Sequence, residues 1–395
     1  MPSFADLSNE ILLLICEACE AMAGSLYGIV LTSRQLHTLA KPLLYKTVDL
    51  SHRHGSVGHR HFDRIASFRS IVLNQKELAA FVTRLFLTVA QDTRVTHGER
   101  ETTDPPEREP IPAFKLDPPE NIRILLDCLP NLRVLLLDVR NEEGWQDDKT
   151  TMYCYNRVTV WGPLYDQIPR LCNVRVLHLT VGRLCETWFT LPSLVHLYIG
   201  LGCWVQDTFD ESILAQSRIS KITMETEVTV LSPCDAMTPV KSFKALPELT
   251  SITLYISNQL QEHHTGDVVD YATEGCSFGN LQRELADAAM AQRLEHFEIR
   301  SLDRPEYLTD LSPFDNFGDF TALESLVIPQ CSLEAANRHD WPEFPVSLKT
   351  LSLLYPKPSA GEPHQTVLYA GTGVKVVVTE DTYGFSHTWH SLLQQ

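Results

Sequence analysis

The sequence predicts an α/β fold in which short parallel strands, separated by helices and loops, stack one after another into a solenoid. Three observations predict it. A short apolar motif returns nine times, helical periodicity fills several intervals between its copies, and an amino-terminal segment stands outside the pattern. One such repeat cannot bury its apolar face alone, so consecutive repeats must stack to build a continuous core. This arrangement presents a long surface rather than a single central pocket.

The repeated motif is an apolar residue, two variable residues, an apolar residue, one variable residue and a third apolar residue. The last two apolar side chains point to one face of a strand, and the first anchors the turn before it. An ordinary mixed α/β domain with many buried strands is disfavoured, because all nine copies share the same phase. The copies begin at Val82, Leu132, Val174, Leu194, Ile219, Leu249, Leu294, Leu323 and Leu348.

The spacing of the motif indicates the kind of repeat. Successive copies start 50, 42, 20, 25, 30, 45, 29 and 25 residues apart. Five of these intervals lie close to the roughly 20 to 29 residues of a leucine-rich repeat, and the longer ones fit repeats that carry insertions. Residues 82–380 therefore resemble the leucine-rich repeat family, which implies strands on a concave face with helices and loops on the convex face. The Asn or Cys that the family places three positions after the motif occurs only as Cys331, which predicts uneven curvature.

Apolar residues at helical intervals predict helices between the strands, at residues 62–82, 121–129 and 277–294. A terminal strand is expected over Val374 to Val378, after the turn at Gly371 and Gly373. The helices should pack behind the strands.

Residues 4–46 predict a small helical module of a different kind. Ser8 or Asn9 can cap a first helix, and Pro42 is expected to mark the exit from a second amphipathic helix. This segment resembles the F-box family, whose usual form is Leu-Pro-x-Glu-Ile-Leu, an apolar helix, and Leu-Val-Cys-Lys-x-Phe-x-x-Leu-Ala. Ser8, Ser33 and Leu36 depart from that form. The corresponding positions are Leu7, Glu10, Ile11, Leu12, Ile15, Leu31, Ser33, Arg34, Leu36, Leu39 and Ala40, and the continuation from Pro42 to Tyr45 resembles fungal members.

The two resemblances imply three regions: an F-box-like module at residues 1–50, a connecting helical segment and cap at 51–81, and a degenerate repeat array at 82–395. They also imply a function. The module would dock on a Skp-like adaptor, and through it on the cullin of an SCF-type ubiquitin ligase, while the array binds a protein substrate. The residues expected to contact the adaptor are Leu7, Glu10, Ile11, Leu12, Ile15, Leu31, Arg34, Leu36, Leu39, Pro42 and Leu43.

Two alternatives stay open. The helices could simply cap the first strand of the array, as every repeat array needs a cap. The array could also be an interaction scaffold without a ligase role. Copurification with the adaptor distinguishes the scaffold from the receptor, and the double substitution Ile11→Lys with Leu12→Lys is expected to abolish it.

The variable residue between the last two apolar positions of each motif should point away from the core and form a column on the concave face. Aromatic residues in such a column are suitable anchors for a partner. Cover by the insertions is the alternative. The candidate substrate-binding residues on this face are Leu136, His178, His196, Tyr198, Thr223, Tyr255 and Glu298.

The formal net charge of −17 is concentrated in four windows that follow strand motifs: residues 92–120, 141–149, 257–275 and 300–320. They should line one edge of the array and attract a basic partner, and they disfavour nucleic acid. The alternative is that these segments only keep the protein soluble.

The sequence contains no nucleophile elbow, phosphate loop or dinucleotide motif, so we expect neither an enzyme nor a cofactor. His52, His54, His59 and His61 lack a further ligand at a recognised spacing, so no metal site is predicted. Ten cysteines without a framework spacing indicate reduced thiols. With no signal peptide or membrane span, the expected location is the cytoplasm, the nucleus or both.

Overall fold

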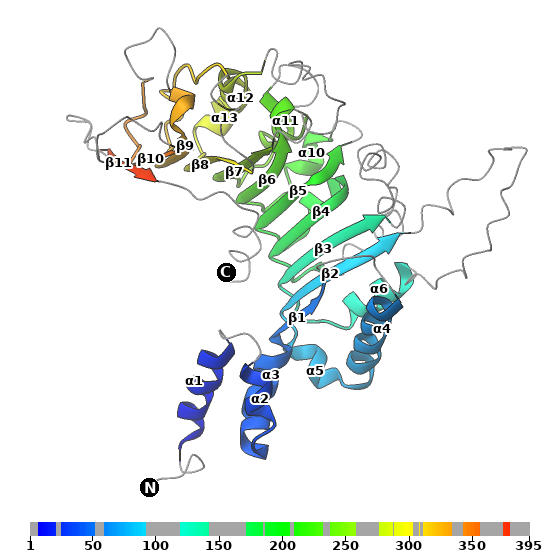
Figure 1. The fold of residues 1–395 in the computed structure, drawn as a ribbon. Helices are drawn as coiled ribbons and strands as arrows, with labels where there is room; N and C mark the ends of the chain where they lie inside the picture. Colours follow the sequence, from blue (N-terminus) through cyan, green and yellow to red (C-terminus); the bar gives the residue numbers. More distant parts are fainter. Residues whose placement is uncertain are drawn as a thin grey trace, which may run out of the picture. The chain divides into compact units, whose positions relative to one another are not determined.

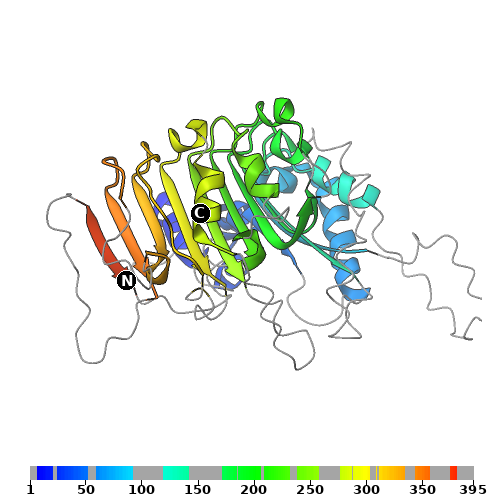
Figure 2. The ribbon, with the colours of Figure 1, turned by 90° about the horizontal axis from the view of Figure 1, so that it is seen from above.

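The structure is a computed structural model. It describes residues 7–20, 25–51, 59–91, 119–141, 171–184, 186–205, 209–231, 238–257, 276–286, 288–302, 308, 311–333, 343–355 and 374–379. These residues form an α/β fold with one parallel sheet of 11 strands, which follow one another in chain order (Figures 1 and 2). The chain divides into two compact units, Met1–Leu177 and His178–Gln395, and the division falls within the fourth strand.

All nine motif copies form strands, as predicted. The motif positions align in register, so that Leu85 pairs with Leu135 in the first unit and Ile222 pairs with Ile252 in the second. The solenoid-like arrangement of parallel strands is thus confirmed. The nine strands are β2 (Arg84–Gln91), β3 (Val134–Asn141), β4 (Val176–Leu184), β5 (His196–Val205), β6 (Lys221–Glu227), β7 (Ser251–Ser257), β8 (His296–Ser301), β9 (Ser325–Pro329) and β10 (Thr350–Leu354).

Two further strands extend the sheet. The terminal strand expected at residues 374–378 is present as β11 (Lys375–Thr379). At the other end, β1 (Thr47–Leu50) pairs with β2 and places Val48 beside Leu85. Tyr45, Val48 and Leu50 have the spacing of the repeat motif, so β1 is a tenth copy that sequence analysis assigned to the amino-terminal module.

A regular turn precedes each strand and joins it to the repeat before. The backbone amides of Arg133 and Val134 both donate to the Thr83 carbonyl, at 2.8 and 3.0 Å, and the pattern recurs in later repeats. A side chain reinforces the turn: Asn131 Nδ2 donates to the Ala80 carbonyl, and Asn173 Nδ2 to the Pro130 carbonyl, each at 2.7 Å. The leucine-rich repeat family places its polar residue after the strand, whereas these asparagines lie before it.

Helices of the first unit match the prediction with one change. The helix expected at residues 62–82 is two helices, α4 (His59–Asn74) and α5 (Lys76–Phe81), because the chain leaves helical geometry at Gln75. The expected helix at 121–129 is α6 (Pro119–Asp127). Their buried side chains include Ile65, Phe68, Val72, Leu78, Ile122 and Leu125.

In the second unit, the helix expected at residues 277–294 is likewise two helices, α12 (Phe278–Leu285) and α13 (Ala288–Ala291). Ser277 caps α12, and stacked phenylalanines fill the core beside it: the ring centroids of Phe278 and Phe314 lie 5.1 Å apart. Short helices complete the other connections: α9 (Glu186–Phe189), α10 (Glu211–Leu214), the 3-10 helix Val228–Leu231, α11 (Thr238–Phe243) and the 3-10 helix Gln330–Leu333.

The amino-terminal segment contains α1 (Asn9–Glu20), α2 (Ser25–Val30) and α3 (Arg34–Lys46). The expected exit at Pro42 is wrong: Pro42 lies inside α3, which continues to Lys46 and leads directly into β1. Proline inside a helix removes one backbone hydrogen bond and its ring crowds the carbonyl four residues earlier, but its φ is close to the helical value, so a helix stabilised by packing can include it. We refer to α1–α3 as the helical module.

Candidate functional site

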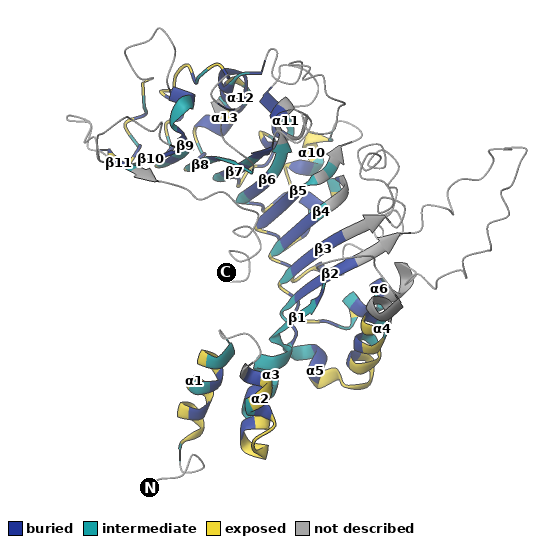
Figure 3. Cartoon of the chain, in the orientation of Figure 1, coloured by how far each residue is buried: buried dark blue, intermediate teal, exposed yellow. Residues whose placement is uncertain are grey.

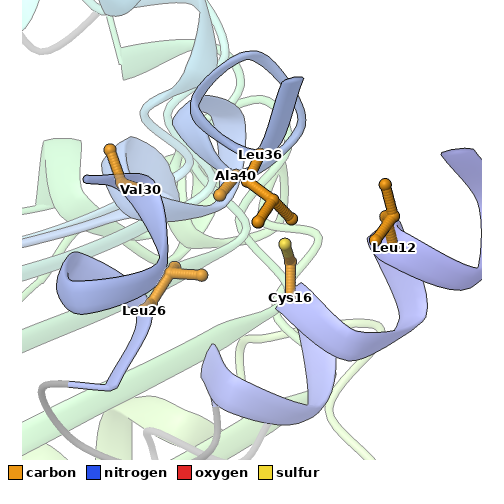
Figure 4. Close-up of a cluster of buried hydrophobic side chains, with 6 residues drawn as sticks. All are labelled: Leu12, Cys16, Leu26, Val30, Leu36 and Ala40. Atoms are coloured by element: carbon orange, nitrogen blue, oxygen red, sulfur yellow. The ribbon is translucent and has the colours of Figure 1, made fainter. Parts of the chain in front are cut away.

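The helical module has a small hydrophobic core of its own. Cys16 of α1 points toward Leu36 and Ala40 of α3, with Leu12 beside them and two residues of α2 opposite (Figure 4). The six buried residues are Leu12, Cys16, Leu26, Val30, Leu36 and Ala40. Burial also raises the pKa of the Cys16 thiol, so it acts as an apolar packing residue.

Polar contacts fix the three helices at their ends. Ser33 caps α3 by accepting a hydrogen bond from the Leu36 amide at 3.2 Å. Gln35 Nε2 donates to Asn9 Oδ1 at 2.9 Å, which joins α3 to the start of α1. At the other end of α1, Glu20 pairs with Lys46 at 3.2 Å. The module therefore holds its side chains in a defined arrangement at the amino-terminal end of β1.

Several large apolar side chains of the module face solvent. Leu31 is 70% exposed, Leu14 63%, Tyr27 61% and Ile11 46%. In Figure 3, parts of both α1 and α2 have the colour of exposed residues. With Leu13, these four side chains account for five of the nine exposed large hydrophobic residues in the described part of the chain. We call Ile11, Leu13, Leu14, Tyr27 and Leu31 the apolar set.

The eleven residues that the F-box resemblance assigns to adaptor contact differ in their exposure: some are buried in the module core and others face solvent. Leu12 and Leu36 are 1% and 5% exposed, so they pack inside the module and do not face a partner. Leu7, Leu39 and Leu43 pack partly against the same core. Ile15 and Pro42 are half-buried, and Glu10, Ile11, Leu31 and Arg34 are exposed. Sequence analysis missed Leu13, Leu14 and Tyr27, because helical spacing alone does not show which stripe faces the core.

The concave column is largely covered. Leu136, His178, His196, Tyr198 and Thr223 are each less than 10% exposed, so of the seven candidate residues only Tyr255 and Glu298 are partly exposed. The low exposure agrees with the alternative prediction, in which the concave column is covered. The five buried side chains therefore cannot contact a partner directly in this structure.

The buried part of the column forms a polar network in the second unit. The rings of His178 and Tyr198 are in contact, with centroids 3.8 Å apart and planes tilted by 46°, and His196 Nε2 lies 2.9 Å from Thr223 Oγ1. Tyr198 donates its hydroxyl hydrogen to the Glu225 carboxylate. Burial lowers the pKa of both histidines to about 3, so they are neutral at physiological pH.

A second network lies around Glu298 of β8. Its carboxylate accepts hydrogen bonds from Arg300 and from Thr253, the latter at 3.3 Å, and lies 3.2 Å from His296 Nε2. Burial alone would raise the pKa of Glu298, but the contacts with His296 and Arg300 outweigh it and lower the pKa to about 2. This carboxylate is therefore ionised and already saturated by its neighbours, so it stabilises the sheet rather than offering a free charge to a partner.

Several expectations lie outside the described residues. Most of the four acidic windows, and the side chains of His52, His54, His59 and His61, are not described. Among the residues that are described, no group of three or more His, Cys, Asp or Glu side chains could hold a metal ion. Within the same residues, no helix is long and apolar enough to cross a membrane.

The comparison with protein-family models finds no match for this chain, and the comparison with curated proteins finds none either. Function is therefore inferred from the helical module, the sheet and their side chains.

Proposed function

We propose that the protein is a substrate receptor of an SCF-type ubiquitin ligase, in which the helical module docks on a Skp-like adaptor and the repeats bind the substrate protein. The observation that carries this proposal is the apolar set. A module with a complete core still leaves four apolar side chains at least 46% exposed, on α1, in α2 and directly after α2. Several exposed large apolar side chains on one small module are typical of protein-interaction sites.

The repeat array supports the second half of the proposal. Parallel repeats give an extended surface suited to recognition. In this proposal the chemistry of ubiquitin transfer belongs to the partner enzymes, and the chain itself only positions the substrate.

The structure changes how the docking should be tested. Leu12→Lys would place a charge in the module core and unfold it, so the pair Ile11→Lys and Leu12→Lys cannot separate docking from folding. Ile11→Lys with Leu31→Lys changes two exposed side chains instead. We expect the wild-type chain to copurify with a Skp-like adaptor, and this variant to lose at least about tenfold in affinity, since a buried apolar anchor contributes more than about 1 kcal/mol.

A matched control is available in the same chain. Leu73 on α4 is 46% exposed, as is Ile11, and Val346 is fully exposed. Leu73→Lys with Val346→Lys therefore adds the same two charges at exposed apolar positions outside the module and should retain the adaptor. Absence of binding by the wild-type chain would leave the interaction scaffold without a ligase role. Equal loss in both variants would show that the added charge, not the module, controls binding.

A further inference from the structure

Arginines mark the amino-terminal edge of the sheet in the first unit. Arg84 begins β2, Arg133 directly precedes β3, and Arg175 directly precedes β4. The backbone ladder places them on successive repeats: the Arg133 amide donates to the Thr83 carbonyl, and the Arg175 amide to the Arg133 carbonyl, both at 2.8 Å. Neighbouring strands lie about 4.8 Å apart, so Arg133 and Arg175 lie side by side. Arg84 instead pairs with Val134, one position further along the strands.

Two of these arginines are open to solvent. Arg133 and Arg175 are exposed and Arg84 is half-buried. Within the part of the chain that the structure describes, neither Arg133 nor Arg175 forms an ion pair. Lys46 lies at the same edge, two repeats before Arg133, but Glu20 neutralises it at 3.2 Å. Like charges on adjacent strands repel each other, and a bound anion would remove that repulsion.

The described residues of the first unit carry a small excess of positive charge, unlike those of the second. The described residues of the first unit contain twelve Lys and Arg and nine Asp and Glu, whereas those of the second contain ten and thirteen. The whole chain has a formal charge of −17. A local excess of positive charge in so acidic a chain directs an anionic partner to one place.

We propose that Arg133 and Arg175 form a docking surface for an acidic polypeptide segment of a partner protein. The guanidinium group binds a carboxylate through two parallel hydrogen bonds, and a short acidic segment needs only two or three such contacts. A nucleic acid fits less well, because its binding neutralises many phosphates and the net charge of the chain repels a long polyanion. The surface is separate from the apolar set and does not depend on the proposed function.

The test uses the full chain and a fluorescently labelled synthetic peptide of alternating glutamate and glycine, with binding followed by anisotropy at low and moderate salt. Arg133→Glu with Arg175→Glu should weaken binding roughly tenfold or more, and the wild-type affinity should fall as salt rises. Arg133→Gln with Arg175→Gln, a milder change, should weaken it less. Circular dichroism confirms that each variant is folded.

Lys241→Glu with Lys244→Glu is the matched control, because it makes the same change in net charge in the second unit, at one residue of α11 and at the residue directly after it. This control should bind the peptide like the wild-type chain. Equal weakening in the control would overturn the proposal, and so would a single-stranded oligonucleotide that binds more tightly than the peptide through the same arginines. The variant Ile11→Lys with Leu31→Lys should still bind the peptide, so a failure of adaptor docking does not affect this result.

Discussion

Two buried histidines give the second unit a specific response to acid. Above pH 6.5, His178 and His196 are neutral in both the folded and the unfolded state, so their contribution to stability is fully present. Below that value the unfolded chain takes up protons that the folded chain refuses until about pH 3. Each pH unit in this window then costs about 1.4 kcal/mol for each histidine. Stability should therefore fall as the pH decreases from about 6.5 toward about 3.

We predict that His178→Gln reduces this pH dependence by about half, because one of the two histidines no longer titrates. The measurement is the free energy of unfolding in urea at a series of pH values, and the slope is compared rather than the absolute stability. Lys221 lies near His196, and the raised pKa of Glu225 changes stability with pH in the opposite direction. Both residues are present in the wild-type chain and in His178→Gln, so they do not affect the comparison of slopes. His37→Gln, at an exposed position of α3, is the control. Equal slopes for wild type and His178→Gln would contradict the assignment.

At the scale of the repeat, the turn before several strands is stabilised by a side chain that the apolar motif does not include. Asn131 and Asn173 each donate to a carbonyl of the preceding repeat, and Ser347 Oγ does the same to Leu323 at 2.8 Å. Removing one such donor leaves a carbonyl with one partner fewer, which typically costs about 1 kcal/mol.

Asn131→Ala and Asn173→Ala are therefore each expected to lower the free energy of unfolding of the first unit by about 1 kcal/mol. The double variant should lose about the sum, unless the adjacent turns are coupled. Urea titration followed by circular dichroism measures both values. Cys172→Ala, at the exposed neighbouring position, should change stability little. A loss in Cys172→Ala as large as that in Asn173→Ala would show that the ladder bond is not responsible.

The elements also show what sequence patterns can and cannot predict. Apolar spacing predicted the nine strands in register, because burial of one face requires period two at every copy. It missed β1, since Tyr45 begins a motif inside a helix, and it placed the end of α3 at Pro42 because the intrinsic cost of proline does not include packing. It also assigned Leu12 and Leu36 to an exposed face. Which stripe of a short helix is buried depends on its neighbours, and one sequence does not show them.

For the whole molecule, the net charge comes from residues outside the described part of the chain. The described residues contain 22 Lys and Arg and 22 Asp and Glu, so the formal charge of −17 belongs entirely to the remaining residues. The helices, strands and turns are thus neutral as a set. Attraction of a basic partner, if it occurs, must come from the acidic windows rather than from the sheet.

The last prediction concerns those windows. A labelled lysine-rich peptide should bind the full chain with an affinity that falls as salt rises, because screening weakens attraction between exposed charges. Replacing Glu142, Glu143, Asp147 and Asp148 by their amides should reduce both the affinity and its salt dependence. Replacing Glu211, Glu248, Glu295 and Glu324, four exposed acids of the described elements, makes the same change in net charge and should have a smaller effect. Equal effects of the two variants would mean that the peptide responds to net charge alone, and that the acidic windows form no distinct binding region.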